Sequence, residues 1–139
     1  MAVVQKSLRI PEKILKEIER MAEDAQKDFS SVANALLEEA VKTHRCPGIV
    51  FSEGVHGRRA RVAGTGVEVW EIVASYKSLG KSLERLRKAY HWLTEQQLRS
   101  AIGYYESYPE EIDRLIAANE GWTLEAVRKK HPFLPSGGQ

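Results

Sequence analysis

The sequence predicts a mainly α-helical protein with short β segments, built from two small parts. Apolar residues recur at helical spacing over residues 12–26 and 32–43, and again from residue 69 onward. Residues 3–10 instead alternate between apolar and polar side chains, as a strand with two unlike faces does. Between residues 49 and 69, glycines separate short β-like pieces, which predicts a β-hairpin.

The N-terminal strand has an apolar side and a polar side. The apolar side holds Val4, Leu8 and Ile10, with Lys6 interrupting it, and the polar side holds Gln5, Ser7 and Arg9. Pro11 ends the strand and suits the first turn of a helix. A lone short strand leaves its backbone groups unpaired, and no comparable strand follows until beyond two helices. The simplest partner is therefore the same strand of a second chain.

A strand, a helix, a turn and a second helix follow each other within about 45 residues, too few to bury a sound core alone. This order resembles the ribbon-helix-helix DNA-binding family, which includes Arc and MetJ. The resemblance spans residues 3–44 and is carried by Arg9-Ile10-Pro11 and by Ser30-Ser31-Val32, which opens the second helix. Lys27-Asp28 stands where that family has a glycine. The resemblance implies an intertwined dimer whose antiparallel ribbon enters the major groove of DNA.

The same resemblance puts the polar side of the strand on the bases. Glutamine suits adenine, arginine suits guanine, and serine reaches either kind of edge, so Gln5, Ser7 and Arg9 fit that role. The start of the second helix, at Ser30, Ser31 and Val32, would offer backbone N–H groups to a phosphate. The alternative is an ordinary edge strand with a solvated polar face.

Residues 61–119 resemble a second family, the small helical domain known as domain of unknown function 433. The resemblance is carried by residues 61–72, 93–101, 104–105 and 109–113, although Gly66-Val67-Glu68 departs from the usual pattern. It implies a three-helical domain of helix-turn-helix type. It also implies an antitoxin role beside a PIN-like ribonuclease toxin.

Local signals place the boundaries of this second part. Pro47 and Gly48 end the preceding helical pattern. Ser82 is suited to begin one helix, Thr94 with Gln97 forms a capping-box pattern, and Pro109 suits the first turn of another helix. The predicted β pieces are residues 49–51, 59–62 and 67–69. We therefore expect domains at residues 1–45 and 46–120, followed by a short helix and flexible tail at 121–139.

Three further groups of residues have two interpretations each. A basic cluster near the hairpin either binds phosphate or is plain solvated surface: Arg58, Arg59 and Arg61. The front of the helix after Thr94 is either a second DNA reader or a solvated face: Gln96, Gln97, Arg99 and Ser100. An apolar stripe near the C-terminus, with one arginine, either enters a toxin groove or packs on the protein's own core: Trp122, Leu124, Val127, Arg128 and Phe133.

Composition narrows the class of protein. The net charge is only +2, and residues 1–45 hold eight basic and eight acidic side chains. The single cysteine, the absence of a signal-like start and the absence of a long apolar run predict a soluble cytoplasmic protein. His44 and Cys46 lack further ligands at suitable spacing, and no catalytic motif is present, so we expect no metal, no cofactor and no enzymatic activity.

Together the two resemblances imply a sequence-specific DNA-binding transcriptional repressor. They also imply that it is the antitoxin of a type II toxin–antitoxin pair, which neutralises a PIN-like ribonuclease toxin and autoregulates its operon. The expected partners are a palindromic duplex operator, a second copy of the chain as a dimer or dimer of dimers, and a PIN-like ribonuclease toxin. Two alternatives stay open: a toxin-inhibiting module with little DNA binding, and a stand-alone repressor without a toxin.

Overall fold

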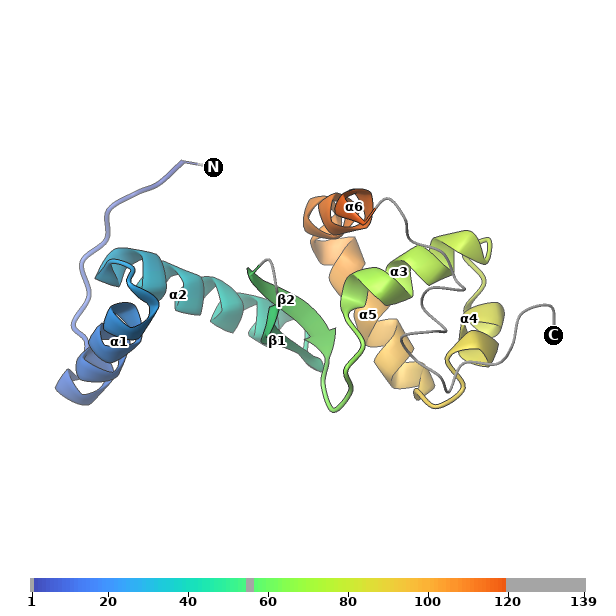
Figure 1. Cartoon of the computed structure of the whole chain (residues 1–139), viewed down its shortest axis with the longest axis horizontal. Coiled ribbons are helices and arrows are strands. Elements are labelled where there is room, and N and C mark those ends of the chain that lie inside the picture. The colour runs from blue at the N-terminus through green and yellow to red at the C-terminus, as the bar shows by residue number, and fades with distance from the viewer. Residues whose placement is uncertain (1, 55–56, 120–139) are drawn as a thin grey trace. The chain divides into compact units, whose positions relative to one another are not determined.

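The structure, a computed structural model, describes residues 2–54 and 57–119 (Figure 1). The chain forms two compact units, Met1–Lys42 and Thr43–Gln139. The division lies close to the predicted boundary between residues 45 and 46. The expectation of a mainly helical protein with one short hairpin is confirmed, because the described residues form six helices and two strands.

The first unit is a pair of helices, α1 (Glu12–Ala25) and most of α2 (Phe29–Arg45). Pro11 is the N-cap of α1, one position before the first turn in which it was predicted. The C-cap of α1 is Gln26, which takes the left-handed backbone conformation that glycine usually supplies at a helix end. Its φ is 55°, and its N–H donates to Glu23 O. The N–H of Lys27 then donates to Ala22 O at 3.0 Å, which closes the turn without glycine.

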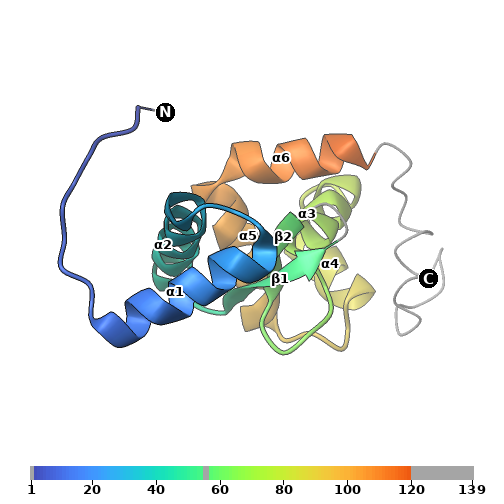
Figure 2. The same cartoon turned by 60° about the vertical axis from the view of Figure 1, so that its left-hand side comes forward.

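Residues 2–11 form neither helix nor strand in the single chain, and the N-terminal segment runs as an open trace (Figure 2). All of them except Ile10 are exposed. The strand predicted at residues 3–10 needs a neighbouring strand to supply its backbone hydrogen bonds. The strand in a shared ribbon therefore stays a prediction.

The second unit begins with an antiparallel hairpin of β1 (Ile49–Gly54) and β2 (Gly57–Val62). In its register Ile49 lies opposite Val62 and Phe51 lies opposite Ala60, so one face of the hairpin is apolar. Ile49, Ala60 and Val62 are buried on that face. The third β piece, predicted at residues 67–69, forms no strand: Glu68 makes only an isolated bridge to Arg61.

Four helices pack with this hairpin: α3 (Val69–Ser78), α4 (Leu83–Ala89), α5 (Glu95–Ser107) and α6 (Pro109–Ala118). Helices α3 and α5 are central, since each contacts β2, α4, α6 and the other, and α5 also contacts β1. The fully buried side chains of the core come from every one of these elements, among them Ile49, Val62, Ile72, Leu86, Tyr90, Leu98, Tyr104 and Ile112.

The predicted starts of these helices are confirmed. Ser82 Oγ accepts from the N–H of Arg85 at 3.2 Å at the start of α4. Thr94 and Gln97 form the reciprocal capping box of α5, with bonds of 2.9 and 3.0 Å. Pro109 is the first residue of α6. Each device satisfies or removes a backbone donor that the first turn of a helix leaves without a partner.

Candidate nucleic-acid interface

The first unit leaves most of its apolar surface uncovered. Among the described residues, only Ala22 and Val32 of this unit are buried apolar side chains. All the exposed large apolar side chains of the described chain also lie here: Val3, Val4, Leu8, Ile14, Met21, Leu37 and Val41. Large exposed apolar surfaces are rare on monomeric proteins, so these side chains are candidates for contact with another molecule.

These side chains follow the periods of their elements. Ile14 and Met21 are seven residues apart on α1, and Leu37 and Val41 are four apart on α2, so each pair shares one face of its helix. Leu37 is 57% exposed and Val41 is 63% exposed. Ile14 and Met21 therefore leave an exposed apolar edge on α1, and Leu37 and Val41 leave one on α2.

The three predicted base-reading residues, Gln5, Ser7 and Arg9, are all exposed in the single chain. They precede α1, separated from it by Ile10 and Pro11. The structure therefore leaves the three side chains accessible to another molecule. A DNA contact by any of them stays a prediction.

The predicted phosphate site at the start of α2 already holds a carboxylate. The helix begins earlier than predicted, at Phe29, because Asp28 caps it. Asp28 Oδ1 accepts from the N–H of Ser31 at 2.7 Å, and Val32 donates its N–H to Asp28 O at 3.3 Å. The bond from Ser31 lowers the pKa of Asp28 below its ordinary value. Ser30 and Ser31 are exposed and Val32 is buried.

The three hairpin arginines all lie on β2, where each has partners within the second unit. Arg58 pairs with Glu53 at 3.2 Å and donates to Phe51 O. Arg61 donates to Ser52 Oγ at 3.3 Å and also bonds Thr65 O.

The side chain of Arg59 is largely enclosed, since only 15% of it is exposed. It lies 3.6 Å from the carboxylate of Glu68. Arg59 and Arg61 therefore hold the hairpin against the turn before α3, whereas Arg58 joins β2 to β1.

The four residues predicted as a second DNA reader lie in the first two turns of α5, and they differ in the contacts that their side chains already make. Gln97 is engaged in the capping box, and Ser100 Oγ donates to Gln96 O at 2.9 Å. Arg99 lies 3.5 Å from Glu95, one turn earlier, and Gln96 is exposed. Gln96 and Arg99 are therefore the two members of this set that extend into solvent.

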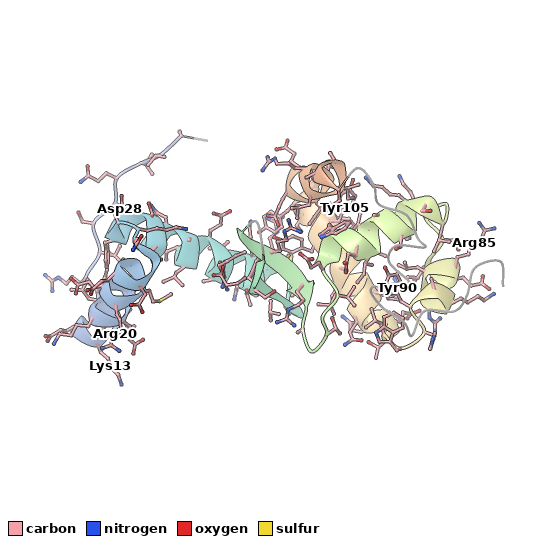
Figure 3. The ribbon with its side chains drawn as sticks, viewed as in Figure 1. Lys13, Arg20, Asp28, Arg85, Tyr90 and Tyr105 are labelled. Carbon is pink, nitrogen blue, oxygen red and sulfur yellow. The ribbon has the colours of Figure 1, made fainter. Side chains whose placement is uncertain are left out.

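A buried polar contact fixes the segment between α4 and α5. Tyr90, directly after α4, places its hydroxyl 2.9 Å from Ser75 Oγ of α3, and both residues are fully buried (Figure 3). Burial raises the pKa of Tyr90 well above its ordinary value, so the hydroxyl stays protonated. This contact holds the end of α4 against α3.

A second network ties α6 to α3 and α5 at the surface. Asp113 of α6 accepts from Lys77 Nζ at 3.0 Å and from the Tyr105 hydroxyl at 2.8 Å. These bonds lower the pKa of Asp113, and the bonds of Lys77 with Tyr105 and Asp113 raise the pKa of Lys77. Below this surface, Tyr104 of α5 donates to Glu111 at 2.7 Å.

A small groove of about 270 Å³ lies between α3, α4 and α5. It is lined by Tyr76, Leu83, Arg99, Ile102, Gly103 and Glu106. In the part of the chain that the structure describes, no three His, Cys, Asp or Glu side chains gather in a way that could hold a metal ion. The predicted toxin-binding residues Trp122, Leu124, Val127, Arg128 and Phe133 lie outside the described residues.

Comparison with known proteins finds a family match within the second unit. Residues 49–105 match the family described as "Protein of unknown function (DUF433)". The crystal structure of a DUF433 member protein from Anabaena variabilis is 33% identical to this sequence, covering 78% of this chain and 99% of that one, with a TM-score of 0.44. This chain belongs to the DUF433 family. No curated protein matches the sequence.

The DUF433 match begins with β1 and ends within α5, so it covers the hairpin and the first three helices of the second unit. The predicted resemblance to this family is confirmed. The first unit, Met1–Lys42, lies outside the residues that match the DUF433 family. No helix among the described residues has the length and apolar character that crossing a membrane requires.

Proposed function

We propose that this DUF433 protein is a sequence-specific DNA-binding repressor that dimerises through residues 1–45. In this proposal two N-terminal strands pair into a ribbon-helix-helix ribbon, and Gln5, Ser7 and Arg9 of each chain read a palindromic operator. The observation that carries the proposal is the confinement of the exposed large apolar side chains of the described chain to residues 3–41. The chemistry of the strand's polar side supports DNA as the ligand.

A second copy is the occupant that suits this surface best. Pairing of residues 3–10 with the same residues of a partner would satisfy both backbones and bring Val4 and Leu8 to one side of the ribbon. Those side chains would then cover the open edges of the helices, where Leu37 and Val41 lie. Two interleaved units would bury a core that a single unit of this size is too small to form.

The charge distribution within the first unit also favours DNA at the ribbon. Residues 3–16 carry four basic side chains and one acidic, whereas residues 17–39 carry two basic and seven acidic. Lys13 and Arg20 extend from the side of α1 that faces away from α2 (Figure 3). The unit as a whole is close to neutral, but the strand end is positive, and local charge decides how a phosphate backbone is attracted.

Replacing Arg9 by alanine tests base reading directly. We expect the change to cost about 1–3 kcal/mol of binding free energy at the cognate site and to relax specificity at one base pair, since a bidentate contact to guanine would be lost. The cognate site is obtained by selection from random duplexes. Binding of the wild type and the Arg9→Ala variant is then measured by fluorescence anisotropy on that site and on each single-base variant.

The matched control is Arg114→Ala, because Arg114 is an exposed arginine of α6 with no proposed contact to DNA. It removes the same charge without touching the strand, so it should leave the base preference unchanged. Equal losses on cognate and scrambled duplexes for Arg9→Ala would mean that Arg9 contacts only phosphate. Failure of the wild type to select any site would contradict the proposed function itself.

We further propose that the repressor is an antitoxin that neutralises a PIN-like ribonuclease and controls its own operon. The support is the resemblance of residues 61–119 to antitoxin-type domains, together with the apolar stripe near the C-terminus. Co-expression with the product of the adjacent gene should yield a complex in which ribonuclease activity is lost. A complex stable in high salt, without operator binding by the chain, would favour the alternative of a pure toxin inhibitor.

A further inference from the structure

A second basic surface lies on α4 and the turn before it, far in sequence from the N-terminal strand. Residues 77–88 carry five basic side chains and one acidic. Arg85 and Lys88 are three residues apart and share one side of α4, and Lys81 lies in the turn directly before the N-cap residue Ser82. All three are exposed, and Arg85 extends outward from α4 (Figure 3).

The cations of this surface differ in what they already contact. Lys77 is engaged with Asp113, and Arg87 lies 3.3 Å from Glu95. Lys88 lies 3.6 Å from Glu84, but both side chains are more than 70% exposed, so the pair holds Lys88 only weakly. No ion pair among residues 2–54 and 57–119 involves Lys81 or Arg85.

The backbone that carries these side chains is fixed at both ends. Gly80 and Lys81 take left-handed conformations in succession, with φ 71° and 59°, and the N–H of Lys81 donates to Tyr76 O at 2.8 Å. Ser82 caps the start of α4, and the buried Tyr90–Ser75 contact holds the segment after its end. A lysine in the left-handed region is uncommon, and here it places a cation directly before the arginine-bearing helix.

We propose that Lys81, Arg85 and Lys88 form a second DNA contact that binds phosphates of the duplex without reading its bases. The first unit holds seven basic and eight acidic side chains, so it provides no net positive charge for the non-specific part of DNA affinity. A fixed group of exposed cations on the second unit supplies that part. The inference rests on DNA binding by the chain, but not on base reading by Gln5, Ser7 and Arg9.

The test is the salt dependence of DNA binding by the full chain. Each phosphate contact contributes about 0.9 to the slope of the logarithm of the binding constant against the logarithm of salt concentration. We expect the triple variant Lys81→Ala, Arg85→Ala, Lys88→Ala to lower the slope by about 2–3 per chain. It should weaken binding to selected and random duplexes by the same factor, because phosphate contacts carry no sequence information.

Two controls accompany this variant. The charge-preserving triple Lys81→Arg, Arg85→Lys, Lys88→Arg should keep the wild-type slope, and Arg114→Ala should change it by no more than one contact. A triple-alanine variant that melts like the wild type yet keeps the wild-type slope would overturn the inference. So would a loss confined to the selected site, which would indicate base contacts.

The outcome separates this inference from the proposed function. A wild type that binds random duplexes with a steep salt slope, lost in the triple variant, but selects no sequence would support the phosphate contact and contradict the repressor. If the wild type selects a site but the triple variant keeps the wild-type salt slope, the repressor is supported and the phosphate contact is contradicted. Loss of binding to an acidic protein partner, with DNA binding intact, would assign the basic surface to that partner and overturn the inference.

Discussion

Replacing Leu37 by glutamate will convert the chain from a dimer into a monomer at micromolar concentration. Leu37 is 57% exposed on the single chain, beside Val41, and the proposed dimer buries both. A carboxylate there would lose its hydration without gaining a partner, at a cost of several kcal/mol per site, and twofold symmetry places it in the interface twice. Since each 1.4 kcal/mol is a factor of ten, the dimer dissociation constant should rise by at least about a thousandfold.

Sedimentation equilibrium measures this change directly. The matched control is Ala35→Glu, which adds the same charge to α2 at an exposed position two residues away, on the side of the helix opposite Leu37. That variant should keep the dimer. A Leu37→Glu protein that stays dimeric, or a wild type that sediments as a single 15.7 kDa chain at all concentrations, would contradict the proposed interface.

Replacing Leu86 by alanine should lower the free energy of unfolding of the second unit by about 2–5 kcal/mol. Leu86 is completely buried on α4, packed in the core that the hairpin and the four helices share. Removing its side chain beyond the β carbon loses the burial of those atoms and leaves a cavity that the surrounding residues fill only in part. Guanidinium unfolding followed by the fluorescence of Trp70 and Trp92 reports on this unit.

The effect at Leu86 should be the same at every protein concentration, because the second unit has a complete core of its own. The effect at Leu37 should instead depend on concentration, since the dimer that we propose shares the core of the first unit between two chains. The control Leu86→Met preserves volume and should cost less than about 1.5 kcal/mol. A loss below about 1 kcal/mol for Leu86→Ala, or an unfolding midpoint that moves with concentration, would contradict this division.

The helices of the second unit were predictable because their signals are local. Ser82, the pair Thr94 and Gln97, and Pro109 act within three or four residues of themselves, so the sequence alone shows what they do. The start of α2 was placed at Ser30 to Val32, one to three residues too late, because several adjacent polar residues are suitable caps. The structure selects Asp28 among them.

The start of α3 was predicted without its cause. Glu68 and Glu71 form a reciprocal capping box there, although Glu71 is buried. From the sequence, two nearby glutamates are expected to be solvated charges. Their hydrogen bonds with backbone N–H groups can be recognised only in the folded turn. The same turn ends the predicted β piece at residues 67–69 after a single bridge.

At the candidate sites, the sequence could not predict contacts between residues that are far apart in the chain. The hairpin arginines are a basic cluster in the sequence, but the register brings Glu53 opposite Arg58, and the turn before α3 brings Glu68 to Arg59. The Tyr90–Ser75 contact joins residues fifteen apart. The N-terminal strand is a different case, because the proposed partner of residues 3–10 is in another chain and no contact within one chain tests it.

Native mass spectrometry of the full chain with its selected operator tests the central proposal most directly. Two chains sharing one ribbon should give a complex of two chains, each of 15.7 kDa, on one duplex, and Leu37→Glu should abolish it. Adding a second palindrome should add two further chains together. A complex with a single chain per duplex, or one that forms equally well with the Leu37→Glu protein, would contradict the shared ribbon.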